Sequence, residues 1–282
     1  MADGIGLALA AMAFYGLADW IYKHAAARGV RAHHFLMLQA FFFAPGIFLY
    51  GLATGTLALG KPFVWGMAAG MLLFVALYNF ARSLATGAVS IVVPVFRLSF
   101  AMTAVLAVLL LDESMTQWKL IGLAASLGAV WLLLGGGASA GRRAAGAAVL
   151  RVVVAMVTMS VVNLIYKIGV MTGGSPATVM TGQASVFVSL ATGFAIARDR
   201  GFRPPPGAWR YGATAAVLLL FAQVLLLAGL KSGQASVLVP VAQLSFVVTS
   251  ALGFFFMREP ITLRKGCGLA FAVAALLCLA HS

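Results

Sequence analysis

The sequence predicts an all-α membrane protein of ten transmembrane helices, arranged as two inverted repeats of five helices each. Composition is the first reason, because hydrophobic residues make up 63% of the 282 residues, charged residues make up 9%, and the mean hydropathy is +1.05. A soluble domain usually carries about 25% charged residues, so these figures exclude an ordinary soluble domain and a disordered chain. The second reason is that segments of the first half recur in the second half.

Ten apolar windows in the sequence are long enough to cross a membrane. A hydrocarbon core about 30 Å thick requires about 20 apolar helical residues, and backbone amides in lipid must be paired within the helix. The predicted spans are Ile5–Lys23, Phe35–Ala53, Phe63–Leu84, Ala88–Leu111, Thr116–Leu134, Val149–Met171, Ala177–Ala197, Trp209–Leu230, Gln234–Met257 and Ile261–Leu279.

The basic residues are divided unevenly between the two sets of loops. The chain holds 19 Lys and Arg against 6 Asp and Glu, a net charge of +13. Cytoplasmic loops collect Lys and Arg, so this excess predicts topology and a lipid bilayer as partner, not a nucleic acid. The loops after the odd-numbered spans, with their helix ends, hold 14 of these residues, whereas the other side holds only Lys61, Lys119, Lys167 and Lys231. We therefore expect the first set to face the cytoplasm and both termini to lie outside a cell inner (plasma) membrane.

The clearest internal repeat is SIVVPVFRLSF at Ser90–Phe100, which matches SVLVPVAQLSF at Ser236–Phe246 in seven of eleven positions, 146 residues later. Further upstream, Ile21–Lys23 matches Ile165–Lys167 at a spacing of 144 residues. Each copy has five spans, an odd number, so the second copy enters the membrane from the opposite face. The repeats are therefore predicted to be inverted.

The predicted organisation is a first five-helix repeat at 1–134, a linker at 135–147 and a second repeat at 148–282. The linker contains the Gly- and Ala-rich run GGGASAGRRAAG, a composition typical of a flexible connection. No strand is predicted before it and no Lys-Ser/Thr pair follows, so it does not fit a nucleotide-binding loop.

Both halves contain a proline in the fourth span and an acidic residue just after that span, Glu113 or Glu259, followed by a threonine and a glycine-bearing last helix. This pattern resembles the EamA-type branch of the drug/metabolite transporter superfamily, and the resemblance covers the whole chain. It implies a ten-helix transporter fold. It does not imply one substrate, since the family includes exporters of amino acids, other metabolites and drugs.

Pro94 and Pro240 occupy equivalent positions in the middle of the fourth and ninth spans. A proline removes one backbone hydrogen bond and frees a carbonyl about one turn earlier. Irregular backbone at membrane depth is tolerated only against protein or water. The pair predicts helix kinks beside a midplane cavity, with a simple packing kink as the alternative.

Arg97 lies near the predicted centre of the fourth span, and its repeat mate is the neutral Gln243. A charge facing lipid at that depth costs about 3 kcal/mol or more, so Arg97 is expected to face the protein interior. A guanidinium group suits a carboxylate or a phosphate. Arg97 and Gln243 are therefore candidate substrate-binding residues; the alternative is that Asp19 or the freed carbonyls hold Arg97 in a structural role.

Asp19 is the only acid predicted inside a span, and its mate is Asn163. Lys23 follows four residues later on the same helix face, so an ion pair at the helix end is one interpretation. If transport is coupled to protons, Asp19 is the only intramembrane carboxylate available. The remaining substrate-site candidates are polar side chains at similar depth, for which hydrogen bonds between helices are the alternative role: Gln39, Gln183, Tyr78, Asn79, Ser99 and Ser245.

Several other polar residues are assigned structural roles. Glu113 and Glu259 are expected to fix turns at helix ends, and Tyr22 and Tyr166 to anchor at the membrane interface. Gly66 and Gly70 form a GxxxG pair that allows close helix approach. The four histidines (His24, His33, His34 and His281) lie at span ends and are not expected to form a metal site or a catalytic triad, and no cofactor is predicted.

These features together predict a secondary transporter of a small carboxylate-bearing metabolite such as an amino acid, driven by a gradient or by exchange. Export is implied by the family resemblance alone. A membrane-embedded enzyme would need a Ser/His pair, paired carboxylates or a metal cluster within the membrane, and the spans offer none. A non-transporting scaffold or a lipid or drug translocator is the remaining alternative, and either a monomer or a homodimer is compatible with the sequence.

Overall fold

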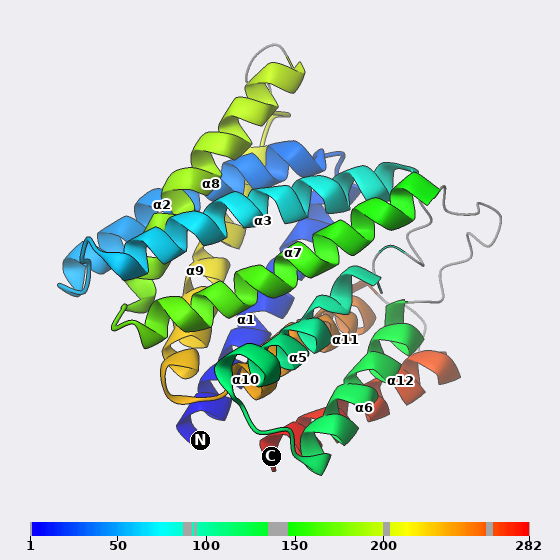
Figure 1. The fold of residues 1–282 in the computed structure, drawn as a ribbon. Coiled ribbons are helices and arrows are strands. Elements are labelled where there is room, and N and C mark those ends of the chain that lie inside the picture. Colours follow the sequence, from blue (N-terminus) through cyan, green and yellow to red (C-terminus); the bar gives the residue numbers. More distant parts are fainter. Residues whose placement is uncertain are drawn as a thin grey trace.

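The computed structural model describes residues 2–86, 92, 95–134, 146–199, 204–257 and 262–281, which form helices and connecting turns without a strand (Figure 1). Among these residues, six helices are long and apolar enough to cross a membrane by themselves. They are α1 (Ala2–Ala27), α2 (Ala32–Ala53), α3 (Lys61–Thr86), α7 (Gly146–Met171), α8 (Pro176–Asp199) and α9 (Ala208–Ser232). The remaining crossings use α5 (Ser99–Leu111), α6 (Gln117–Leu134), α10 (Ala235–Gln243), α11 (Ser245–Met257) and α12 (Leu263–Ala280). The predicted all-α membrane class is confirmed.

The predicted ninth span is divided into two helices, α10 and α11, which meet at Leu244. Pro240 lies inside α10 and cannot donate a backbone hydrogen bond. At the break, the Leu244 N–H lies 3.2 Å from the carbonyls of both Pro240 and Val241. The fourth span has a turn at the equivalent Leu98, whose N–H bonds the carbonyl three residues back at 3.1 Å. Pro94 lies outside the described residues, so only the kink predicted at Pro240 can be placed.

The packing of the helices follows the sequence repeat. Helix α1 packs on α9 and α11, and its repeat mate α7 packs on α3 and α5, the mates of those two helices. In the same way α2 packs on α9 while α8 packs on α3, and α6 packs on its own mate α12, beside the rest of the bundle (Figure 1). Contacts that recur when the two halves are exchanged are those expected of two units related by a pseudo-two-fold axis.

The two repeats run in opposite directions through the bundle. Helix α1 ends where α9 begins, because Arg28 lies over the ring of Tyr211 at 5.7 Å. Helix α7 ends where α9 ends, because Lys167 donates to the Leu230 carbonyl at 2.7 Å. The mates α1 and α7 are therefore antiparallel. We call the end of the bundle with Arg28, Arg31, Arg82, Arg198 and Arg210 the arginine face, and the end with Lys61, Lys119, Lys167 and Lys231 the lysine face.

Small residues let α3 and α8 approach closely, as the GxxxG pair predicts. A Cβ atom at Gly66 or Gly70 would collide with the backbone of α8 at Val179 or Gln183, and one at Gly182 would collide with α3 at Phe63. Close backbone contact of this kind is a common way to join helices in lipid, where burying apolar surface against protein gains little over burying it in lipid.

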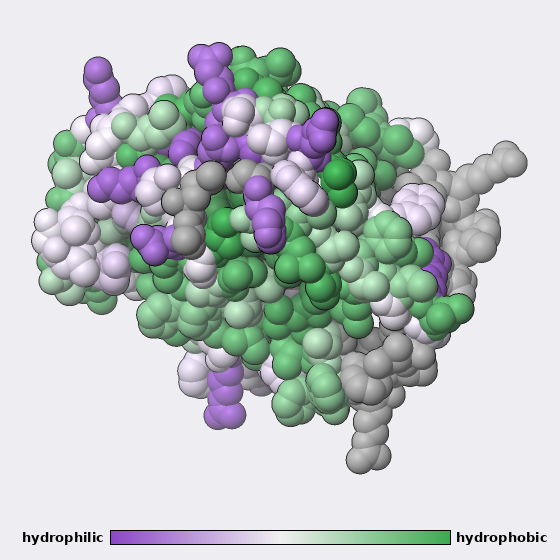
Figure 2. All heavy atoms as spheres, turned by 90° about the horizontal axis from the view of Figure 1, so that it is seen from below, coloured by the Kyte–Doolittle hydropathy of each residue, from purple (hydrophilic) through white to green (hydrophobic). Residues whose placement is uncertain are grey.

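Large apolar side chains cover much of the outside of the bundle. Phe255 is 73% exposed, Leu109 is 69% exposed and Trp131 is 64% exposed. Figure 2 shows one face on which hydrophobic residues cover the centre and the right, while most hydrophilic residues gather across the upper left. A soluble protein rarely exposes so much contiguous apolar surface, so this surface fits contact with lipid. Helix α7 begins at Gly146, inside the predicted linker, whose residues 135–145 lie outside the described residues.

Candidate functional site

Arg97 and Gln243 meet in the middle of the bundle, where each directly precedes a turn in its helix, at Leu98 and Leu244. The Arg97 Nη1 atom donates to Gln243 Oε1 at 3.0 Å. Because these two positions are repeat mates, the hydrogen bond crosses from one half of the molecule to the other. The sequence predicted both residues for the site, and the structure brings them together.

Asp19 of α1 and Ser245 of α11 complete this arrangement. The Arg97 Nη2 atom lies 3.4 Å from Asp19 Oδ2, and Ser245 Oγ donates to the same oxygen at 3.2 Å. The side chains of Arg97 and Asp19 are 22% and 41% exposed. We call Asp19, Arg97, Gln243 and Ser245 the central polar group. It holds one cation and one anion, both partly exposed, and the contact between them is longer than the 2.7–2.9 Å of a tight charge-assisted bond.

The repeat mates on the other side of the pseudo-axis form a buried and neutral arrangement. Asn163 Nδ2 donates to Thr103 Oγ1 at 3.2 Å, and Ser160 Oγ donates to the Ser99 carbonyl at 3.0 Å. Asn163 is only 2% exposed, and Ser99, predicted for the substrate site, is 4% exposed. The two sides of the axis therefore differ in both charge and exposure.

One pair of hydrogen bonds repeats on both sides of the pseudo-axis. Thr249 Oγ1 lies 3.0 Å from the Gly16 carbonyl and 3.3 Å from the Ser245 carbonyl. Its mate Thr103 contacts the mates of those two residues, at 3.5 Å for the Ser160 carbonyl and 2.8 Å for the Ser99 carbonyl. The repeat in the sequence thus corresponds to a repeat in side-chain contacts.

The matched Gln39 and Gln183 do not join the central polar group. Gln183 is buried in α8 and accepts a hydrogen bond from the Tyr166 hydroxyl at 2.6 Å. Tyr166 is 2% exposed, so the prediction that it anchors at the membrane interface is wrong; burial against α8 satisfies its hydroxyl instead. Gln39 is half-buried in α2 and makes no side-chain hydrogen bond to another described residue. Gln183 therefore braces α7 against α8, which is the alternative role that the sequence left open.

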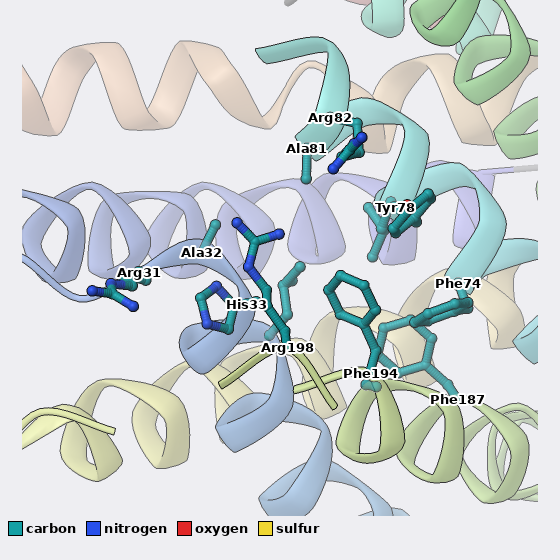
Figure 3. A pocket seen from close by; sticks show the side chains of 13 residues that line it. Arg31, Ala32, His33, Phe74, Tyr78, Ala81, Arg82, Phe187, Phe194 and Arg198 are labelled. Carbon is teal, nitrogen blue, oxygen red and sulfur yellow. The ribbon is translucent and has the colours of Figure 1, made fainter. Parts of the chain in front are cut away.

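Tyr78 and Asn79 also lie away from the central polar group. The Asn79 amide donates to the Val75 carbonyl of its own helix at 2.9 Å. Tyr78 lines a cleft of about 590 Å³ between α3 on one side and α2 and α8 on the other (Figure 3). Phe74, Phe187 and Phe194 share this lining, and Arg31, Arg82 and Arg198 stand around it.

Glu113 has a role that the sequence only partly indicated. It was expected to fix a turn, but it is buried and binds the start of α10 in the other repeat. Its Oε1 accepts from the Ala235 N–H at 2.7 Å, and its Oε2 accepts from the Ser236 N–H at 2.9 Å and the Ser236 hydroxyl at 2.5 Å. A carboxylate at a helix N-terminus satisfies orphan amides and interacts well with the helix dipole. Its mate Glu259 lies outside the described residues.

Two lysines beside Glu113 were counted from the sequence only as loop charges. Lys167 Nζ donates to the carbonyls of Leu230 and Gly233 at 2.7 and 2.5 Å. Lys119 is fully buried and donates to Gln234 and, at 2.5 Å, to the Ser114 carbonyl. We call Glu113, Lys119 and Lys167 the lysine-face cluster. Their repeat-matched positions were the signal in the sequence that could have identified them.

The histidines are less scattered than the sequence indicates. His33 Nε2 and His34 Nε2 lie 2.8 and 2.5 Å from Asp199 Oδ2, at the arginine face. The three ligand atoms lie within 4.8 Å of one another, a spacing that could hold a metal ion. Hydrogen bonds already join the three side chains, and Arg31 lies 3.9 Å from the other Asp199 oxygen, where its charge opposes a bound cation.

Comparison with known proteins places this architecture. The sequence profile of the EamA-like transporter family matches residues 2–135 and, a second time, residues 146–280. A protein of known crystal structure superposes with a TM-score of 0.84 over 99% of this chain and 96% of its own, at 16% identity, which shows a shared fold.

An uncharacterised protein, MJ1333.1 of Methanocaldococcus jannaschii, is 31% identical over 72 residues, which cover 26% of this chain and 53% of that protein. The match therefore spans only about half the length of this curated relative. The two family matches, by contrast, account for both halves of the chain and agree with the two repeats seen in the helix packing. The chain belongs to the EamA-like transporter family, and its long apolar helices are those of a multi-pass membrane protein.

Proposed function

We propose that this transporter exports a small carboxylate-bearing metabolite, such as an amino acid, by alternating access of its two inverted repeats. The observation that carries the proposal is Arg97, which lies at a helix break in mid-bundle, is 22% exposed, and is held by Gln243 and loosely by Asp19. A purely structural arginine at this depth would be expected to be enclosed by its partners. Partial exposure favours a transporter over the non-transporting scaffold.

The central polar group suits a zwitterion. A substrate carboxylate can replace Asp19 at the Arg97 guanidinium, whose fork binds two oxygens at once. A substrate ammonium group can then take the place of Arg97 beside Asp19. Because the two protein charges are 3.4 Å apart, one small amino acid can meet both without a large change in the site. A hydrophobic cation is a poorer substrate, because it can pair with Asp19 but then leaves the Arg97 charge without a counterion.

Alternating access is supported by the difference between the two sides of the pseudo-axis. Asp19 is half-buried, with its side chain 41% exposed, whereas its mate Asn163 is buried. On the lysine face, the lysine-face cluster is bonded to the turn between α9 and α10 and to the start of α10. This arrangement is the one expected of a state open toward the arginine face and closed toward the lysine face. Exchanging the roles of the two halves would give the opposite state.

The topology proposed for this state follows from the basic residues. Lys and Arg near membrane-spanning segments favour the cytoplasm, so we assign the arginine face to the cytoplasm and both termini to the outside of the inner membrane. Export is then loading from an open cytoplasmic side. The driving force is a solute or proton gradient, and the direction rests on family resemblance alone.

Arg97→Gln is the variant that tests the substrate class. We expect a screen of amino acids and other small carboxylates in proteoliposomes to find counterflow in the native protein. Loss of a hydrogen bond to a charged group should lower that counterflow about 10- to 100-fold in the variant. Arg210→Gln is the matched control, because Arg210 is exposed at the start of α9, away from the central polar group. Unchanged transport in folded Arg97→Gln protein would remove Arg97 from the site.

Asp19→Asn tests proton coupling. The change gives Asp19 the neutral side chain of its mate Asn163 and removes the acid of the central polar group. If Asp19 carries the coupled proton, an imposed pH gradient should drive accumulation in the native protein and no longer do so in the variant. Solute exchange should continue in the variant but need a higher concentration of a zwitterion, because the carboxylate beside the substrate ammonium group is also lost. A gradient that still drives the variant would assign coupling to another group or to exchange.

A further inference from the structure

We infer that the cleft between α3 and the α2–α8 pair binds an anionic phospholipid, with the phosphate at the arginines and an acyl chain along the aromatic wall. The cleft lies between different helices from the central polar group and shares none of its residues. The inference therefore does not rest on the proposed substrate. Its volume of about 590 Å³ lies within the range of about 300–1,000 Å³ that is usual for ligand sites.

One end of the cleft is an apolar wall of aromatic rings. The ring of Phe74 lies 6.5 Å from that of Phe187 and 6.1 Å from that of Phe194, and Tyr78 lies 5.3 Å from Phe194. Beneath the rings, buried Ala191 belongs to an apolar cluster that joins α2, α3 and α8. The Arg198 guanidinium lies 6.0 Å from the centre of the Phe194 ring, where this wall meets the cationic end. The chemistry of the remaining rings matches a hydrocarbon chain.

The other end of the cleft is cationic. Arg31 precedes α2, Arg82 lies near the end of α3, and Arg198 lies near the end of α8, so all three are at the membrane-surface ends of their helices. Figure 3 shows Arg31 and Arg198 with His33 at one end of the pocket and Phe74 and Phe187 at the other. Basic pockets between transmembrane helices at this depth are suited to lipid phosphate groups.

The nearby acid does not cancel this charge. In the part of the chain that the structure describes, Asp199 is the acidic residue next to the cationic end, and its oxygens face His33, His34 and Arg31. It is not among the residues that line the cleft. Among the described residues, Arg31, Arg82 and Arg198 line the cleft against this one carboxylate, which leaves an excess of positive charge for a phosphate.

The surface of α3 indicates that the occupant comes from the membrane. Val64, Met71, Val75 and Tyr78 recur at helical spacing and are all exposed, so they form one stripe along α3. Tyr78 belongs both to this stripe and to the lining of the cleft. The cleft is thus continuous with an apolar helix face that fits lipid contact. A lipid can reach it by moving sideways, whereas a water-soluble anion gains nothing from the aromatic end.

The test is a titration of the purified full-length protein in maltoside micelles with short-chain lipids, read by calorimetry. The probes are dioctanoyl-phosphatidylglycerol, dioctanoyl-phosphatidylcholine with the same chains, inorganic phosphate with no chain, and phenylpropanoate as an aromatic carboxylate. We expect the anionic lipid to bind at least about tenfold more tightly than each of the others, because only it supplies both a net charge and chains.

Two variants separate the head site from the chain site. Arg82→Gln with Arg198→Gln should weaken binding of the anionic lipid about thirtyfold, since each basic residue near an anionic headgroup contributes about fivefold. Ala81→Trp keeps the charge but fills the cleft, and it should abolish the binding. Arg210→Gln removes an arginine at the same face outside the cleft and should change nothing. All of these positions are described, and Arg82, Arg198 and Arg210 are exposed, so their substitution should leave folding intact.

Equal affinity of the native protein and the double arginine variant for phosphatidylglycerol would overturn the inference. So would equal binding of inorganic phosphate and the lipid, which would make the cleft a simple anion site. Competition by phenylpropanoate as strong as that of the lipid would assign the cleft to a solute instead. If Ala81→Trp does not give a monodisperse protein, Ala191→Leu on α8 replaces it, with the same expected loss.

Discussion

Arg97 and Asp19 are counterions for each other near the middle of the membrane. Without one of them, the charge of the other would be unpaired. Their 3.4 Å contact is loose, and Ser245 and Gln243 each hold one of the two partners. A charge at this depth is costly without a partner. The pair therefore contributes to stability as well as to the proposed binding of a zwitterion, and the two roles can be separated.

A double-mutant cycle measures the coupling of this pair. Arg97→Gln and Asp19→Asn should each lower the free energy of unfolding by about 1 kcal/mol or more, because each leaves the opposite charge without its counterion. The double variant, which makes both residues neutral, should be less destabilised than the sum of the two single changes. Thermal or denaturant unfolding in one detergent gives the three values. Strict additivity would mean that the two side chains do not interact in the membrane protein.

Some of the residues that the sequence predicted for the site meet there and others do not, and one physical limit of sequence-based prediction explains the difference. Arg97, Gln243, Ser245 and Asp19 meet, because the repeat and the helix breaks fix their depth and bring mates together. Gln183 has a suitable depth but faces Tyr166 instead. Depth along a helix can be read from sequence, but rotation about its axis cannot when every face is apolar. The same limit explains why Gln39, Tyr78 and Asn79 lie elsewhere.

At the scale of elements, the start of α10 depends on an acid from the other half of the molecule. The buried Glu113 carboxylate accepts hydrogen bonds from two backbone N–H groups and one hydroxyl group. The preceding Asp112 adopts a left-handed backbone conformation with φ of 53°. This conformation ends α5 directly before Glu113. A residue in one repeat thus holds the first turn of a half-helix in the other.

Glu113→Gln should lower the free energy of unfolding by about 1–3 kcal/mol, because an amide oxygen cannot replace both carboxylate oxygens at the start of α10. Asp112→Asn is the matched control, since asparagine also tolerates the left-handed conformation and the Asp112 side chain is exposed. Thermal unfolding of the two variants side by side measures the difference. Similar stability of Glu113→Gln and the native protein would refute the capping role.

The contact between α3 and α8 makes a second prediction about elements. Gly70→Ala places a methyl group against the Gln183 backbone and should cost about 1–3 kcal/mol through overpacking. Gly6→Ala in α1 is the control, because no atom lies within 4 Å of an added Cβ there. The midpoint of thermal unfolding should fall for the first variant and stay the same or rise for the second. A tolerated Gly70→Ala would show that these two helices are not packed backbone to backbone.

At the scale of the whole molecule, the two repeats have the same fold, but matched residues in them differ in burial. The sequence predicted the fold class and the inverted order of the repeats, because an odd number of spans in each copy allows no other arrangement. The difference between half-buried Asp19 and fully buried Asn163 could not be predicted, since it depends on how one half is tilted against the other. Two matched positions can be alike in sequence and still differ in access to water.

Access to water at these two positions can be measured directly. In a background with Cys267 and Cys278 replaced by serine, Asp19→Cys should react quickly with a charged thiol reagent, and Asn163→Cys should react slowly. The substrate, once it is identified, should raise the rate at position 163 and lower it at position 19. Labelling in intact vesicles with reagent on one side at a time also assigns the arginine face. Equal rates at both positions would contradict the proposed state.

The hydrogen bond from Arg97 to Gln243 has a geometric consequence of its own. It joins two positions that the pseudo-axis carries onto each other, so trading the roles of the halves returns the same contact. A contact away from the axis, such as that of Glu113 with Ser236, is carried by the axis onto a different pair of residues. When the halves exchange roles, this contact must break and the contact between the two repeat mates must form. In the proposed alternating-access cycle, the central hydrogen bond can thus stay in place while the hydrogen bonds at the two ends of the bundle break and form.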